Sequence, residues 1–231
     1  MRHRKGVIAA VMMAFLLTTA AQCNPAQSGK YSTVQSFSNS GLTKLAFQGD
    51  SITFQSTADI NAHYGANYDV AIHATVGVDT SMRGDAVAAD AAQDPAIEII
   101  NLGTNDAVRI GTATPPTIDD VTGRLELFAT EFPASTCIIF VNINTHNPDW
   151  GPANAQAIDD FFSQNPLIFP HVVPWDAAWQ ASNFIPGKNG TAANPDGPHP
   201  NETGRQLLLK LEDQAIQGCP AQAPAQLAPT T

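Results

Sequence analysis

Short apolar runs that alternate with segments of helical length are the feature that most constrains the fold of this 231-residue chain. The runs are rich in β-branched and aromatic residues, as are the strands of a parallel sheet that is buried on both faces. They span residues 45–47, 68–74, 97–102, 137–142 and 172–173. Segments between them place apolar residues on one helical face, at 117–132, 153–163 and 201–216. The alternation predicts an α/β domain, a three-layer α/β/α sandwich with a five-stranded parallel sheet.

The two ends of the chain differ from this pattern in composition. Basic residues precede an uncharged apolar run in residues 1–21, which is typical of a secretory signal peptide, although a buried N-terminal helix is an alternative. Residues 22–43 are rich in Ser, Gln and Asn, and predict a flexible tether. Residues 220–231 are mostly Pro, Ala, Gln and Thr, and predict a disordered tail. We therefore expect a folded domain at 44–219 in an exported protein, either secreted or held at the cell envelope.

The charge of the chain narrows the classes of partner. There are 11 Lys and Arg residues against 21 Asp and Glu residues, which gives a net charge of −10. Arg2, Arg4 and Lys5 lie in the expected signal peptide, so the mature protein is more acidic still. Nucleic acids and anionic lipid surfaces are bound by clustered cations, which the sequence lacks. We expect no nucleic-acid partner, and a monomer because no oligomerisation signal stands out.

Five residues with catalytic chemistry follow the ends of predicted strands. Ser51 follows the first strand, Gly77 the second and Asn105 the third. Asp196 and His199 lie after the fifth, just before the last helical segment. Ligand sites of open parallel sheets lie at the carboxyl ends of the strands. We therefore expect all five residues at the same edge of the sheet.

Together these residue types supply the parts of a serine hydrolase. A serine at a strand-to-helix turn is a nucleophile once a base removes its proton, but Asp50 and Ser51 are also ordinary residues for a helix N-terminus. Asn105 can donate its amide hydrogens to an oxyanion, or it can form an Asx-turn in a polar loop. A carboxylate such as Asp196 holds a histidine base in one tautomer, whereas the alternative is a proline-rich loop with an exposed His199.

The three cysteines are consistent with an oxidising compartment. Cys137 begins a predicted strand and Cys219 ends the last helical segment, so both are expected at the edge of the sheet opposite to Ser51. We predict a disulfide between Cys137 and Cys219. Cys23 is left over and is a candidate for lipidation, although Gln22 is a poor residue before a lipidated cysteine. Contact with a membrane is expected only if Cys23 carries a lipid.

Neither a metal nor an organic cofactor is expected. His199 has no histidine partner at helical spacing, and the cysteines have a structural explanation. The chemistry predicted for the site needs only side chains and backbone amides.

In their order along the chain, these strings resemble the sequence blocks of the SGNH hydrolases, the superfamily of GDSL-type esterases and lipases. Gly49-Asp50-Ser51-Ile52 is similar to the first block, with Ile where Leu is common. Gly77 is the loosest match, to the glycine of the second block. Gly103-Thr104-Asn105-Asp106 matches the third block and Asp196-Gly197-Pro198-His199-Pro200-Asn201 matches the last. The resemblance covers about residues 45–211.

The resemblance implies a flavodoxin-like fold and hydrolysis of an ester through an acyl-enzyme. In that family pattern Ser51 attacks the ester, and His199 acts first as base and then as acid. Asp196 orients His199. The amides of Ser51 and Gly77 and the side chain of Asn105 bind the oxyanion.

Two other functions remain open on the sequence alone. The run from Trp175 to Trp179, followed by the histidine block, resembles SGNH domains of bacterial cell-wall acyltransferases. A polysaccharide O-acetyltransferase or deacetylase with the same site is therefore one alternative. A non-catalytic module that binds glycans or lipids is the other. The expected substrates are small-molecule, lipid or acetylated-polysaccharide esters.

Overall fold

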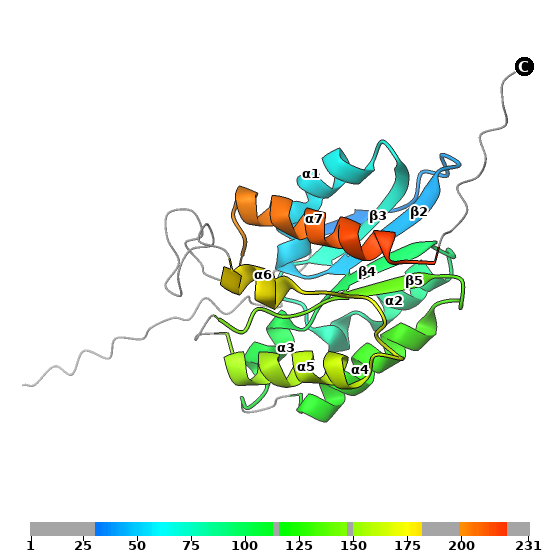
Figure 1. The fold of residues 1–231 in the computed structure, drawn as a ribbon. Helices are drawn as coiled ribbons and strands as arrows, with labels where there is room; N and C mark the ends of the chain where they lie inside the picture. Colours follow the sequence, from blue (N-terminus) through cyan, green and yellow to red (C-terminus); the bar gives the residue numbers. More distant parts are fainter. Residues whose placement is uncertain (1–30, 113–115, 147–149, 182–198, 221–231) are drawn as a thin grey trace, which may run out of the picture.

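A computed structural model of the chain describes residues 31–112, 116–146, 150–181 and 199–220 (Figure 1). The strands are β1 (Ser32–Gln35), β2 (Thr43–Gly49), β3 (Tyr68–Thr75), β4 (Ile97–Asn101), β5 (Cys137–Val141) and β6 (Val172–Val173). The α-helices are α1 (Ser51–Tyr64), α2 (Gly84–Ala91), α3 (Thr104–Arg109), α4 (Ile118–Glu131), α5 (Pro152–Gln164), α6 (Trp175–Ala181) and α7 (Glu202–Gln217). A short 3-10 helix, η2 (Thr80–Met82), follows β3.

The strands form one sheet in the order β1-β3-β2-β4-β5-β6. All pairs from β3 to β6 are parallel, and β1 is antiparallel to β3. Helices α1 and α7 lie side by side on one face, while α2, α4 and α5 cover the other (Figure 1). The three-layer arrangement predicted from the sequence is therefore confirmed.

Alternate residues of the strands supply two cores, one on each face of the sheet. Phe47 of β2 and Ile99 of β4 belong to the core under α1 and α7. Ile100 of β4 and Phe140 of β5 belong to the core under α2, α4 and α5. Burial on both faces explains why these strands are continuous apolar runs in the sequence.

The sheet has a sixth strand that the sequence analysis did not predict. Strand β1 lies within the segment 22–43, which was expected to be a tether, and it pairs with β3 from Ser32 opposite Thr75 to Gln35 opposite Ile72. Its polar side chains are held by hydrogen bonds: the Gln35 side chain donates to the Val70 carbonyl at 2.9 Å. A polar edge strand of this kind lacks the apolar pattern from which strands are predicted.

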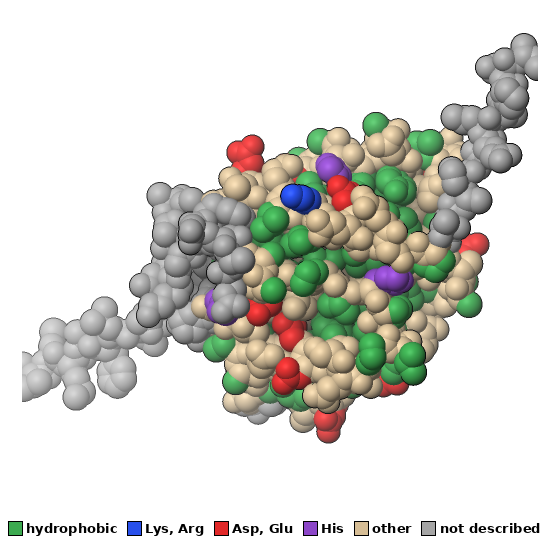
Figure 2. Space-filling view, in the orientation of Figure 1, with side chains coloured by type: hydrophobic (Ala, Val, Ile, Leu, Met, Phe, Trp, Pro, Cys, Tyr) green, Lys and Arg blue, Asp and Glu red, His purple; other side chains and the backbone are tan. Residues whose placement is uncertain are grey.

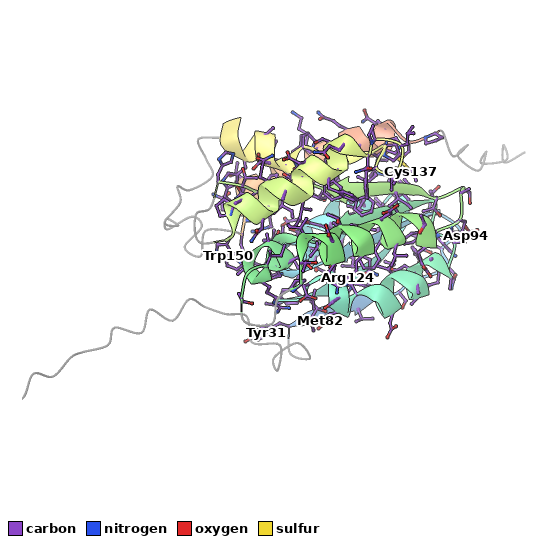
Figure 3. The ribbon with its side chains drawn as sticks, turned by 90° about the horizontal axis from the view of Figure 1, so that it is seen from below. Tyr31, Met82, Asp94, Arg124, Cys137 and Trp150 are labelled. Atoms are coloured by element: carbon purple, nitrogen blue, oxygen red, sulfur yellow. A yellow bond between two sulfur atoms is a disulfide. The ribbon has the colours of Figure 1, made fainter. Side chains whose placement is uncertain are left out.

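Cys137 and Cys219 form a disulfide, the pair that the sequence predicts. Cys137 begins β5 and lies at the end of the sheet opposite to Trp150, which belongs to the end where the candidate site described below lies (Figure 3). Cys23, the signal peptide and the tail from residue 221 lie outside the described residues. Among the helices that the structure describes, none combines the length and apolar character that crossing a membrane requires.

Candidate active site

Ser51 is the first residue of α1, directly after β2 and the helix N-cap Asp50. Gly49 ends the strand, where a Cβ would overlap the side chain of Thr53, so the close approach of strand to helix requires glycine. The Asp50 carboxylate accepts a hydrogen bond from the Ile52 amide at 2.9 Å, which caps the helix. The helix therefore begins at Ser51, and its N-terminus lies at the end of the sheet.

His199 contacts Ser51 although 148 residues separate them in the sequence. The distance from His199 Nε2 to Ser51 Oγ is 2.7 Å. Asn201 caps α7 by accepting a hydrogen bond from the Gly204 amide at 2.9 Å, so His199 lies just before the helix that packs beside α1. A serine hydroxyl at this distance from an imidazole nitrogen is the arrangement of an activated nucleophile and its base.

Polar contacts between α1 and α7 hold the serine and histidine segments together. Arg205 of α7 donates from Nε to Asp59 of α1 at 2.6 Å, and its Nη1 donates to the Pro200 carbonyl at 3.4 Å. Gln206 donates to the other Asp59 oxygen at 3.2 Å. One carboxylate of α1 thus binds two residues of the first turns of α7.

Asn105 lies in the first turn of α3, and only 7% of its surface is exposed. Its Nδ2 donates to Asp50 Oδ2 at 3.1 Å. Burial raises the pKa of Asp50 to about 6, while the Ile52 amide, the nearby His199 and the Asn105 side chain act in the opposite direction. At neutral pH Asp50 is therefore mostly ionised. It fixes one hydrogen of the Asn105 amide and leaves the other for a ligand.

Gly77 lies in the loop between β3 and η2, with a φ of 75° that favours glycine. The Arg109 side chain at the end of α3 donates from Nη2 to the Gly77 carbonyl at 2.9 Å and forms an ion pair with Asp79. At the start of η2, directly after this loop, Thr80 Oγ1 donates to Asp106 at 2.7 Å. These bonds fasten the Gly77 loop to the helix that carries Asn105. Sequence reasoning missed Arg109, because no local pattern links it to Gly77.

Trp150 lies beside His199 on the other side of the site, with ring centroids 6.5 Å apart and planes at 65°. It precedes α5, where Gly151 has a φ of 64°. By contrast, Trp175 and Trp179 are buried, with 2% and 7% exposure, and they pack edge to face against each other. These two tryptophans are part of the core, and the tryptophan at the site is one that the sequence did not single out.

The structure brings Ser51, His199 and Asn105 to one end of the sheet, with the Gly77 loop fastened to the Asn105 helix. Asp196 lies outside the described residues, so its orientation of His199 remains a prediction. Within the described part of the chain, the group of possible metal ligands is Cys137, His171 and Cys219, and its two sulfurs are joined in the disulfide.

The surface shown in Figure 2 carries scattered acidic side chains and few basic ones. This distribution is consistent with the net charge of −10. Among the described residues visible on this face, Lys and Arg side chains do not form a continuous track.

Neither a protein-family model nor a curated protein sequence matches the chain. Several solved structures match it. A lipase/acylhydrolase from Enterococcus faecalis is 18% identical with a TM-score of 0.60, and the match covers 79% of this chain and 100% of that one. A GDSL-like lipase from Bacteroides thetaiotaomicron is 20% identical over 76% of this chain and 88% of that one, with a TM-score of 0.55.

An acetylxylan esterase from Geobacillus stearothermophilus is 16% identical, with a TM-score of 0.56 over 75% of this chain and 94% of that one. The identities of these matches are all below 25%, so the likeness is one of fold. It extends over nearly the whole of each solved chain.

Proposed function

We propose that this chain, which has the fold of the SGNH (GDSL-type) hydrolases, is an exported serine esterase that hydrolyses carboxylic esters through an acyl-enzyme on Ser51. The observation that carries the proposal is the 2.7 Å contact between Ser51 Oγ and His199 Nε2, next to an Asn105 amide held by Asp50. Nucleophile, base and oxyanion donor converge from three separate segments of the chain.

The reaction begins when His199 Nε2 removes the proton of Ser51 and Oγ attacks the ester carbonyl carbon. The carbonyl oxygen becomes an oxyanion, which accepts hydrogen bonds from Asn105 Nδ2 and from the amides of Ser51 and Gly77. The C–O bond to the alcohol then breaks, and His199 gives the alcohol oxygen its proton. His199 then removes a proton from water, which attacks the carbonyl carbon of the acyl-enzyme. The bond from that carbon to Ser51 Oγ breaks and His199 returns the proton to Oγ, which releases the acid and frees Ser51.

The fold assists the charge that develops at the oxyanion. Ser51 is the N-terminal residue of a 14-residue helix, whose dipole favours negative charge at that position. Asp196 is assigned the role of orienting His199, as in the family pattern that its sequence block resembles.

Export is supported by the sequence of residues 1–21 and by the disulfide between Cys137 and Cys219, which forms in oxidising compartments. Lipidation of Cys23 stays an alternative to release. It is checked by the mass of the mature N-terminus of the exported protein.

Deacetylation of polysaccharide is the second candidate function. It is supported by the ring of Trp150 beside His199, because aromatic faces pack against sugar rings, and by the likeness to an acetylxylan esterase. Release of acetate from acetylated xylan or peptidoglycan, measured beside p-nitrophenyl ester hydrolysis, separates the two substrate classes. Transfer rather than hydrolysis would appear as an acetylated sugar acceptor.

The proposal is tested by hydrolysis of p-nitrophenyl butyrate by the mature protein. We expect activity that Ser51→Ala and His199→Ala abolish while circular dichroism stays unchanged. Activity that survives Ser51→Ala would place the chemistry elsewhere. A folded wild-type protein without activity on esters of any acyl length would support the binding module instead.

A further inference from the structure

We propose that Tyr31 and Phe54 form an aromatic wall of the acyl-binding subsite, which gives this enzyme a preference for acyl chains longer than acetyl. This inference rests on the proposed esterase function. In this proposal β1, the strand that the sequence analysis did not predict, positions Tyr31 beside Phe54.

The contacts of β1 with α1 show where the side chain of Tyr31, the residue before β1, lies. Alternate residues of the strand face the helix: Thr33 Oγ1 lies 3.4 Å from Thr57 Oγ1, and the side chains of Gln35 and Asn61 exchange two hydrogen bonds of 2.9 Å. Tyr31 continues the same alternation, and its ring meets Phe54 edge to face at 6.5 Å. The three partners on α1 are spaced by three and four residues and so share one face of the helix.

The backbones of both residues are held next to segments that carry groups of the proposed reaction. Phe54 is one helical turn after Ser51, and its amide donates to the Asp50 carbonyl at 3.0 Å. The Tyr31 carbonyl accepts from the Val76 amide at 3.0 Å, which puts Tyr31 across from the residue before Gly77. Figure 3 shows Tyr31 and Trp150 at the end of the molecule opposite to Cys137 and Asp94. The aromatic pair therefore lies at the catalytic end, on the Gly77 side.

The direction of the acyl group follows from the positions of His199 and the sheet. His199 must protonate the leaving alcohol, so the alcohol half of the ester lies on the side of His199 and Trp150. Trp150 follows β5 and precedes α5, so that side belongs to the β5 half of the sheet. The acyl substituent is on another bond of the tetrahedral carbon, so we place it on the side of the site away from His199. On the opposite side of β2 lie β3 and β1, with Tyr31 and Phe54.

Among the described residues, both aromatic side chains of the pair keep part of their surface exposed. Tyr31 is 38% exposed and Phe54 is partly buried. Methylene groups laid against such side chains lose their contact with water, which stabilises a longer acyl chain and offers an acetyl group little. The pair thus selects for length at the acyl position.

The test compares kcat/KM for p-nitrophenyl octanoate and p-nitrophenyl acetate. We expect the octanoate-to-acetate ratio to fall about tenfold in Tyr31→Ala and in Phe54→Ala, the scale of discrimination reached by apolar pockets. Tyr31→Phe keeps the ring and is expected to keep the ratio. Val34→Ala is the matched control, because Val34 is on the same strand, 74% exposed, and alternates to the face away from α1.

Labelling of Ser51 by a fluorophosphonate, followed by intact mass, shows whether each variant keeps a working site. An unchanged ratio in both alanine variants would overturn the subsite and leave the esterase proposal standing. A wild-type enzyme with no measurable rate beyond acetate would overturn the subsite as well. Absence of labelling in the folded wild-type protein would instead refute the proposed function itself.

Discussion

Asp50 and Asn105, from two adjacent strand ends, are joined by a hydrogen bond of 3.1 Å from the Asn105 amide to the Asp50 carboxylate. Asp50 also caps α1, the helix that begins at Ser51. A single buried carboxylate therefore sets both the start of the serine helix and the orientation of the asparagine amide. An ionised carboxylate can accept hydrogen bonds but cannot donate them. Asn105 must therefore turn its NH2 group, not its oxygen, toward Asp50.

Asp50→Asn tests this orientation. Asparagine caps a helix as well as aspartate does, so α1 should form, but the new NH2 group would face that of Asn105 and turn its amide. We expect kcat to fall roughly 10- to 100-fold with little change in KM, against about 100- to 1,000-fold for Asn105→Ala, which removes the donor. Steady-state kinetics measure both.

Asp120→Asn is the control, because Asp120 serves the exposed capping box of α4 with Thr117. It should leave kcat unchanged. Full activity in Asp50→Asn would mean that Asn105 is oriented without the carboxylate.

The catalytic roles predict a ranking of three substitutions. Ser51→Ala and His199→Ala should remove activity, whereas Asp196→Ala should reduce it less, because orientation of the base is partly supplied by the contact with Ser51. Rates of p-nitrophenyl butyrate hydrolysis give the ranking. Equal loss in all three folded variants would contradict it.

The disulfide is expected to stabilise the fold without affecting catalysis. It closes a loop of 82 residues at the end of the sheet opposite to the site. Replacing Cys137 and Cys219 by alanine should lower the free energy of unfolding by about 2–5 kcal/mol, measured by urea denaturation. Initial rates at 25 °C should stay close to those of the wild type. A large loss of activity in the folded double variant would show that the disulfide supports the site.

Glu212 makes stability depend on pH in a predictable direction. It is 3% exposed on α7, in a cavity lined by Arg205 and Leu208, and burial with a smaller contribution from Asp213 raises its pKa to about 8. The folded state thus keeps a proton that the unfolded chain loses from about pH 4.5 upward. The free energy of unfolding should decrease as the pH rises through this window up to about 8.

Glu212→Gln removes that dependence while it keeps the shape of the side chain. Asp159 and Asp50 also have raised pKa values, of about 7 and about 6, and they affect the stability of wild type and variant alike. The difference in the free energy of unfolding between the two proteins therefore reports on Glu212. Urea titrations at pH 5, 7 and 9 should show the variant gaining relative stability as pH rises. Glu202→Gln, on the exposed first turn of α7, is the control. A constant difference across the pH range would refute the assignment.

The sequence was informative where burial decides the pattern. The apolar runs around Phe47, Ile99 and Ile139 predict central strands, and the topology of a parallel sheet then brings Ser51 and His199 to one end. Strand β1 was missed because Gln35 and its neighbours are held by polar contacts with other segments.

Contacts between distant segments account for the rest. The string that contains Asn105 begins helix α3, which the sequence analysis did not predict, and Arg109 of this helix reaches Gly77. Tyr31 gains its place only through pairing with β3 and packing on Phe54. No local sequence pattern predicts these contacts between distant segments.

The most direct test of the central claim is covalent labelling of the mature protein with a fluorophosphonate, read by intact mass and peptide mapping. We expect one adduct on Ser51, absent in Ser51→Ala and formed far more slowly in His199→Ala, since the imidazole removes the serine proton. A folded wild-type protein that forms no adduct, or an adduct on another residue, would contradict it.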